Sequence, residues 1–206
     1  MVKKELLNMM HIIQFKYLYF FLALLCFSCS ENNFNPKPKG YNRIDLPKPT
    51  YKILNEAHPY TFEYSSQAIV LKDTFARAEK DWIFVYYPQF KATIEITYKD
   101  LKLKPKAFQE LVNDSYKMAS KHQVKAESIE ETVITTPKNY TATLFRLTGQ
   151  VPSQFQFFVS DSTSNFFRGA LYFRTATQND SLAPVIEYVK NDMLHMVNSL
   201  EWKKMK

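Results

Sequence analysis

The stretch Gln154-Phe-Gln-Phe-Phe-Val-Ser-Asp-Ser-Thr-Ser-Asn-Phe-Phe-Arg-Gly-Ala-Leu-Tyr-Phe-Arg174 decides the fold. Two aromatic-rich segments, residues 154–160 and 166–174, flank the polar pentapeptide 161–165. Alternating side chains are typical of strands, because successive residues point to opposite faces of a sheet. One face of each segment is apolar, with Phe155, Phe157 and Val159 in the first and Phe167, Leu171 and Phe173 in the second. The stretch therefore predicts two strands joined by a hairpin turn.

Other strand patterns precede this hairpin, at residues 60–64, 68–71, 82–87, 92–98, 128–134 and 141–148. The run 82–87 is continuously apolar and predicts a central strand. The run 92–98 alternates and predicts a half-buried strand. Short links join successive strands, so we expect the sheet to be largely antiparallel.

Two further segments carry apolar residues at helical spacing. Residues 105–121 predict a helix with Pro105 in its first turn, and residues 181–202 predict a second helix capped by Asp180 or Ser181. The apolar stripes are Phe108, Leu111, Val112, Tyr116 and Ala119 in the first helix, and Val185, Ile186, Val189, Met193, Met196, Val197 and Leu200 in the second. Such stripes need a sheet to cover, so we predict an α+β fold, with a mostly antiparallel sheet covered by two amphipathic helices. The order of elements resembles the Mog1/PsbP-like sandwich.

The amino-terminal segment indicates export. A lysine-flanked apolar run ends at Cys29, after the small residue Ser28, and it is shorter than the ~20 residues of a membrane span. This pattern is typical of a bacterial lipoprotein signal peptide at residues 1–28, with Cys29 acylated after cleavage. A secretory signal with an incidental cysteine and an uncleaved anchor are the alternatives. We expect Cys29 to be the lipidation site that holds the protein at a membrane.

The chain divides into the signal peptide 1–28, a lipidated proline- and lysine-rich tether at 29–50, and a single α+β domain at 51–206. Prolines block regular structure in the tether, and lysines keep it in water. Residues 40–46 also carry apolar side chains. The tether is therefore either a solvated spacer or a docking strip.

Composition narrows the classes of partner. Cys26 and Cys29 are the two cysteines, and cleavage would remove the first while acylation consumes the second, so no disulfide is expected.

The formal net charge of +7 falls to +5 when residues 1–28, with three lysines and one glutamate, are removed. A mild charge spread along the chain does not predict nucleic-acid binding, which favours a dense basic stripe. Anionic lipid headgroups or acidic glycans are more natural partners for surplus lysine.

Catalytic and cofactor motifs are missing from the sequence. Its 3 glycines are too few for a glycine-rich phosphate loop or a dinucleotide fingerprint. The cluster Glu127, Glu130 and Glu131 allows paired-carboxylate catalysis, but a solvated strand is the simpler interpretation. We therefore expect no enzyme activity, no catalytic residue and no bound cofactor.

A metal site is not expected either. No second ligand stands at metal-binding spacing from any of the four histidines, His11, His58, His122 and His195. We expect His195 to be exposed, opposite the apolar stripe of its helix, and His122 to lie near a helix end. The turn 161–165 lacks the glycine and distal glutamate of an EF-hand calcium loop. Asp161 is instead expected to accept backbone N–H groups, and it could pair with Arg168.

Four strings, residues 36–47, 154–162, 165–173 and 179–185, together resemble the gliding motility lipoprotein GldD family of Bacteroidota. The resemblance implies a lipid-anchored protein required for gliding, with Cys29 as the lipidated residue and no enzymatic activity. It also implies association with the type IX secretion machinery, whose envelope proteins would be the partners.

One departure from the family pattern concerns cysteines. Family members often carry them just before the first strand and before the tryptophan of the apolar strand. Here those places read Ala57-His58-Pro59 and Lys80-Asp81-Trp82. The disulfide that such cysteines could form is absent from this chain.

Two functions of different class are compatible with these observations. The first is a non-catalytic interaction lipoprotein of the gliding and type IX secretion apparatus. The second is a periplasmic lipoprotein that binds or hydrolyses glycan or peptidoglycan, which a deep aromatic pocket with converging carboxylates would favour. Glu31 is the single acid directly after Cys29, where surface-export signals are richer in acids. We therefore expect an outer-membrane anchor that faces the periplasm.

Overall fold

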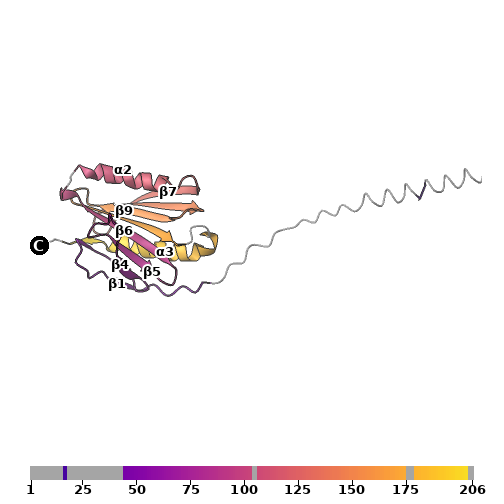
Figure 1. The fold of residues 1–206 in the computed structure, drawn as a ribbon, viewed down its shortest axis with the longest axis horizontal. Helices are drawn as coiled ribbons and strands as arrows, with labels where there is room; N and C mark the ends of the chain where they lie inside the picture. The colour runs from indigo at the N-terminus through magenta and orange to yellow at the C-terminus, as the bar shows by residue number, and fades with distance from the viewer. Residues whose placement is uncertain (1–15, 18–43, 104–105, 175–178, 204–206) are drawn as a thin grey trace, which may run out of the picture. The chain divides into compact units, whose positions relative to one another are not determined.

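The computed structural model describes residues 16–17, 44–103, 106–174 and 179–203 (Figure 1). The chain forms two compact units, Met1–Gly40 and Tyr41–Lys206. Cys29 lies outside the described residues, so its lipidation stays a prediction. The boundaries predicted for the signal peptide, the tether and the domain also stay predictions.

A seven-stranded antiparallel sheet forms the centre of the second unit (Figure 1). Its strands, in spatial order, are β4 (Ile69–Lys72), β5 (Ile83–Tyr87), β6 (Ala92–Asp100), β10 (Asn165–Phe173), β9 (Phe155–Ser160), β8 (Thr141–Gly149) and β7 (Ala126–Thr135). The predicted hairpin is β9 and β10, with Phe167 opposite Val159. Because β10 also pairs with β6 along nine residues, the hairpin occupies the middle of the sheet.

The strand predicted to be central is formed, but it does not lie in the middle of the sheet. β5 is an interior strand, but it is second from one end of the sheet. Its side chains alternate between fully and partly buried, although the sequence 82–87 is continuously apolar. The long β6–β10 pairing inserts the later hairpin beside β6 and leaves β5 nearer the edge.

Two helices cover opposite faces of this sheet. α3 (Asn179–Ser199) packs against the larger core through the predicted stripe, which is buried at Val185, Val189, Met193, Met196 and Val197, and Leu200 is buried just past the end of the helix. α2 (Ala107–Ser120) packs on the other face, in a second cluster that contains Phe108, Leu111, Phe145, Phe158 and Phe166. The predicted α+β class is therefore confirmed, as a three-layer arrangement. Between the two helices, all six residues of β9 are buried.

The ends of both helices differ from the predictions. α2 begins at Ala107, and Pro105 lies outside the described residues. α3 begins at Asn179, before the predicted caps. It ends at Ser199, so Trp202 is not helical as predicted but lies in β11 (Glu201–Trp202). There Trp202 pairs with Tyr60, and its ring contacts Tyr98, Tyr140 and Phe167, because aromatic side chains fill that end of the core.

The first strand segment is also divided. Residues 60–64 form β2 (Tyr60–Thr61) and β3 (Glu63–Ser65), which belong to different small sheets. β2 pairs with β11, and β3 pairs with β1 (Tyr51–Ile53). A short 3-10 helix, η1 (Leu101–Leu103), precedes α2. The partly buried Ile44 packs against the larger core, so the chain contacts the domain before β1 begins.

Candidate functional site

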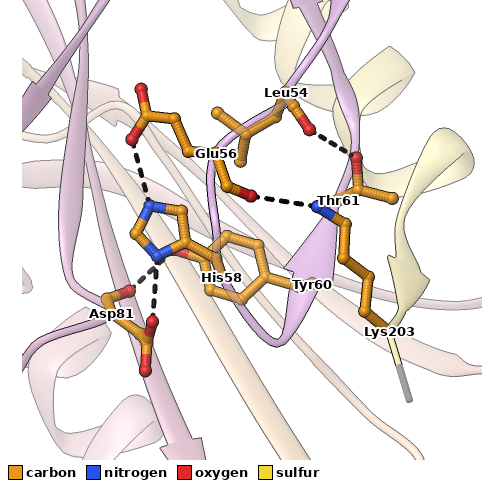
Figure 2. A network of polar contacts seen from close by, with 7 residues as sticks. All are labelled: Leu54, Glu56, His58, Tyr60, Thr61, Asp81 and Lys203. Atoms are coloured by element: carbon orange, nitrogen blue, oxygen red, sulfur yellow. Dashed lines mark hydrogen bonds and ion pairs between the residues drawn. The ribbon is translucent and has the colours of Figure 1, made fainter. Parts of the chain in front are cut away.

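His58 lies at the centre of a polar network in the loop between β1 and β2 (Figure 2). Its side chain is 10% exposed, with Nδ1 2.9 Å from Asp81 Oδ1 and Nε2 3.2 Å from Glu56 Oε2. The ring stacks on Tyr60, whose hydroxyl donates to the backbone oxygen of Asp81 at 2.7 Å. The sequence did not predict this arrangement of a histidine between two carboxylates. Glu56 is two residues from His58, but Asp81 lies next to it only in the folded chain.

The contacts around His58 identify it as a structural clamp. Lys203 Nζ donates to the backbone oxygen of Glu56 at 3.0 Å, and Thr61 Oγ1 donates to the backbone oxygen of Leu54 at 2.8 Å (Figure 2). Burial raises the pKa of Tyr60, so its hydroxyl stays protonated. Both hydroxyls drawn in Figure 2 are therefore engaged as donors to backbone oxygens, and neither is activated as a nucleophile. The network joins the start of the domain to its end.

A buried aspartate forms a second network under α3. Asp192 is 1% exposed, and it accepts hydrogen bonds from Tyr51 at 3.0 Å and from Tyr87 at 3.0 Å. Burial raises the pKa of Asp192 above its usual range, although the tyrosine hydroxyls oppose the shift. Burial and the nearby Asp192 also raise the pKa of Tyr51 to about 12. The sequence held a signal for this site, because Asp192 falls on the apolar stripe three residues after Val189.

His195 is held beside this network. It was predicted to be exposed, but it is half-buried, because its ring stacks on Tyr51 at 3.6 Å and its Nε2 lies 2.6 Å from Glu63 Oε2. These contacts hold β1 and β3 against the last turns of α3. The partners come from distant sequence positions, so helical periodicity alone could not find them.

Arg168 is buried in the middle of the sheet, on the face that α2 partly covers. Its Nη2 donates to Gln156 Oε1 at 2.7 Å. The predicted pairing with Asp161 does not form among the described residues. Burial and the charge of Arg168 lower the pKa of His122, which lies just past the end of α2 as expected. The hydrogen bond between Arg168 and Gln156 therefore lies inside the domain.

The predicted role of Asp161 in the hairpin turn is confirmed. Its Oδ1 accepts the backbone N–H groups of Thr163, Ser164 and Asn165 at 3.0, 2.7 and 2.9 Å. Burial opposes ionisation, but these bonds and the Asn165 side chain lower the pKa of Asp161 overall. Ser162 adopts φ 64°, the left-handed conformation that such a turn needs.

The glutamates on β7 do not form a carboxylate pair. By register, Glu130 lies opposite Arg146 and Glu131 opposite Phe145, so the two point to opposite faces of the sheet. Glu131 accepts a hydrogen bond from Tyr116 on α2. Within the described ranges, no group of three or more acidic, histidine or cysteine side chains is arranged to hold a metal ion. The helices in the described part of the chain also include none that is long and apolar enough to cross a membrane.

A half-open hollow lies between α3 and the end of β8. Its lining includes Glu127, Arg146, Gln154, Glu187 and Lys190. Arg146 and Lys190 both contact Glu187, with Arg146 Nη2 3.1 Å from its Oε1. No tyrosine or tryptophan lines the hollow. It therefore lacks the aromatic lining that would favour a glycan-binding site.

An exposed apolar surface lies at the β4 end of the sheet. We call it the apolar shelf and define it by Ile69, Leu71, Phe75, Phe84 and Tyr86. Ile69, Leu71 and Phe75 are 45%, 43% and 70% exposed. Register places Ile69 beside Tyr86 and Leu71 beside Phe84, and the Phe75 ring packs edge-on against Phe84.

The shelf is exposed because of its position in the sheet. The alternate residues of β5, among them Ile83 and Val85, belong to the core under α3, so the shelf lies on the opposite face. α2 covers that face over β8, β9 and β10. Among the described elements, no helix covers it over β4 and β5.

The antiparallel sheet between two helices defines the class of protein as a compact α+β sandwich. The chain belongs to the gliding motility lipoprotein GldD family, whose model matches residues 31–202. It is therefore a membrane-anchored envelope lipoprotein with a role in gliding motility. This confirms the family resemblance of the sequence.

Two other comparisons add little. No curated protein matched the chain. The solution structure of PsbP from the cyanobacterium Synechocystis sp. PCC 6803 is similar, at 7% identity and a TM-score of 0.45, over 79% of this chain and 98% of that one. A similarity at this level carries no argument about the fold or the function of this chain.

Proposed function

We propose that this protein is a non-catalytic docking component of the gliding apparatus, associated with the type IX secretion machinery. It is held by acylated Cys29 at the outer membrane and faces the periplasm. The match of the family model to residues 31–202 carries the proposal. Other envelope proteins of the gliding and secretion machinery are its partners.

The described side chains support a docking role. The groups best suited to chemistry are used inside the domain: His58 joins two loops, Asp192 joins β1 and β5 to α3, and Asp161 holds a turn. The apolar shelf, in contrast, meets solvent. Exposed apolar patches with polar rims are typical of protein interaction sites.

Deletion of the gene in its own host tests the function. The expected result is loss of spreading on agar and reduced secretion of type IX cargo, both restored by the full-length protein. Crosslinking in intact cells should join the protein to components of this machinery. Normal gliding and normal secretion in the deletion strain would refute the proposal.

A separate variant tests the anchor. Cys29→Ser should move the protein from the membrane fraction to the soluble fraction, because the acyl chains are lost. The wild-type chain, expressed at the same level, is the control. Unchanged membrane association of the variant would count against acylation at Cys29.

A further inference from the structure

We propose that β4 is the docking edge, and that it binds an extended partner segment in which apolar residues are flanked by acidic ones. The segment adds as a further strand and lays its apolar side chains on the apolar shelf. This inference rests on the proposed function and names the kind of partner. Four observations carry it: an end strand, an apolar face beside it, an unpaired basic rim, and the contrast with the other end of the sheet.

β4 is one end of the seven-stranded sheet, so within the described residues one of its backbone edges has no strand neighbour. Its four residues pair with β5 on the other side. An open edge presents N–H and C=O groups on which an extended segment can form a ladder. Backbone bonds supply affinity in this mode, and side chains on alternate residues supply specificity.

The face beside this edge is apolar where a new strand would extend it. Ile69 and Leu71 project from β4 to the same face as Tyr86 and Phe84. Phe75 stands next to Phe84, at 6.0 Å between ring centroids, and remains 70% exposed. A strand added at β4 would place every second side chain against this shelf, which would remove apolar surface from water.

The rim of the shelf is basic. Lys72 ends β4 opposite Ile83, so it projects to the α3 face beside the open edge, and the loop that carries Phe75 also carries Arg77 and Lys80, all three exposed. Among the described residues, none of these three has an acidic partner at ion-pair distance. The acids of this loop are engaged, because Glu79 pairs with Lys99 and Asp73 accepts the N–H of Phe75. An acidic partner segment therefore complements this rim.

The opposite end of the sheet carries the reverse pattern. β7 exposes Glu127, Glu130 and Glu131 along its length. Charged side chains of this kind protect an edge strand from pairing with another chain. One edge of the sheet is thus guarded by charge, and the other presents apolar residues beside free cations. This contrast selects β4 as the edge that binds.

The test uses the full-length protein, extracted from its own membranes in detergent. The probe is a fluorescent peptide, Glu-Val-Thr-Val-Thr-Val-Glu. The control peptide has lysine in place of both glutamates. Fluorescence anisotropy should show that the acidic peptide binds. Its affinity should fall several-fold when the salt concentration rises from about 0.05 to about 0.3 M, because added salt shortens the Debye length and screens the charge attraction. Hydrogen exchange of the backbone amides in β4 should slow when the peptide is bound, because the new ladder protects them.

Two matched pairs of variants locate the site. Leu71→Glu places a like charge on the shelf, and Val133→Glu introduces the same charge on the β7 edge, where Val133 is 60% exposed against 43% for Leu71. The triple change Lys72→Glu, Arg77→Glu and Lys80→Glu is matched by reversal of three exposed lysines near α2, namely Lys102, Lys106 and Lys121. The triple variant should bind the peptide about tenfold more weakly, because the two glutamates of the peptide lose ordinary surface pairs and gain like-charge contacts of similar size. Leu71→Glu should also weaken binding, while both controls bind normally. Far-UV circular dichroism verifies that all four variants are folded.

The outcomes separate this inference from the proposed function. Equal peptide binding by Leu71→Glu and Val133→Glu, or unchanged exchange of the β4 amides, overturns the β4 edge. Two other results would also overturn it. If the protein self-associates and Leu71→Glu abolishes that association, the shelf binds a second copy of the chain. If the protein binds vesicles of phosphatidylethanolamine and phosphatidylglycerol and Leu71→Glu abolishes that binding, the shelf binds lipid. If the deletion strain fails to glide while cells with Leu71→Glu glide normally, the docking edge is wrong and the gliding role stands. If the deletion strain glides and secretes normally, the proposed function fails whatever the peptide does.

Discussion

Gly169→Ala tests whether the middle of the sheet is packed as tightly as the structure shows. Gly169 lies on β10, where a Cβ atom would sit 2.5 Å from both Cε1 and Cζ of Phe157 and 3.2 Å from Cδ1 of Ile96. Both neighbours are buried in the core under α3. Carbon atoms normally meet at about 3.5–4.0 Å, so the Phe157 ring would have to move by about 1 Å.

The expected loss of stability follows from that clash. Overpacking a filled core costs about 1–3 kcal/mol, and the upper part of this range applies because the ring is enclosed. Replacing glycine by alanine recovers about 0.4–1 kcal/mol through the unfolded chain. We therefore expect a net loss of about 2 kcal/mol, which lowers the melting temperature by about 4–8 °C in a chain of this length.

Urea denaturation of the purified protein measures this change. A double-mutant cycle with Phe157→Leu shows whether the ring is the cause, because leucine lacks the two ring atoms that clash. The two changes together should be at least about 1 kcal/mol less damaging than the sum of the single effects. If Gly169→Ala is as stable as wild type, or if the two effects simply add, the packing argument is wrong.

Three further predictions concern stability. Asp192→Leu should cost about 2–4 kcal/mol, because the buried hydroxyls of Tyr51 and Tyr87 lose their acceptor, and Asp192→Asn should cost less. Since burial raises the pKa of Asp192, its favourable contribution is present below the unfolded pKa and is lost as pH rises through the folded value. Wild type should therefore lose stability relative to Asp192→Asn as pH rises from 3 to neutrality, and parallel pH profiles would contradict this. Asp161→Ala should cost about 1–2 kcal/mol at neutral pH through lost turn bonds. The pKa of Asp161 is lowered, so this difference should fade as pH drops through the folded value, and a constant difference in urea melts would refute it. Trp202→Ala should cost about 2–4 kcal/mol by opening a cavity beside three aromatic rings, whereas an unchanged thermal midpoint would show that β11 does not hold the domain.

Local pattern predicted most of the sheet. Period-two alternation identified β6, β8, β9 and β10 to within a residue or two, because their side chains divide between distinct faces. A continuous apolar run identified β5 as an interior strand, but its place second from the end of the sheet is set by the distant pairing of β6 with β10. Local pattern failed for β11, because two residues are too few to show a period and the pairing with β2 joins distant parts of the domain.

The candidate sites divide in the same way. Asp161 was predictable, because its hydrogen-bond partners lie within four residues. The contact between His58 and Asp81 spans 23 residues through a loop of no regular period, so only the fold reveals it. The apolar shelf was hidden for another reason: the run 68–71 has the composition of a buried strand, and its exposure depends on where α2 stops.

The β2–β11 pair has a consequence for export. It joins Thr61 to Glu201, so the second described strand and the last one meet across about 140 residues. A chain that crosses a membrane with its amino terminus leading delivers β2 early and β11 last. Until the final residues have crossed, Tyr60 lacks its Trp202 partner and the aromatic end of the core stays open. A chain exported in this way would therefore remain incompletely folded until residues 201–202 have crossed, with apolar surface exposed to aggregation for that time.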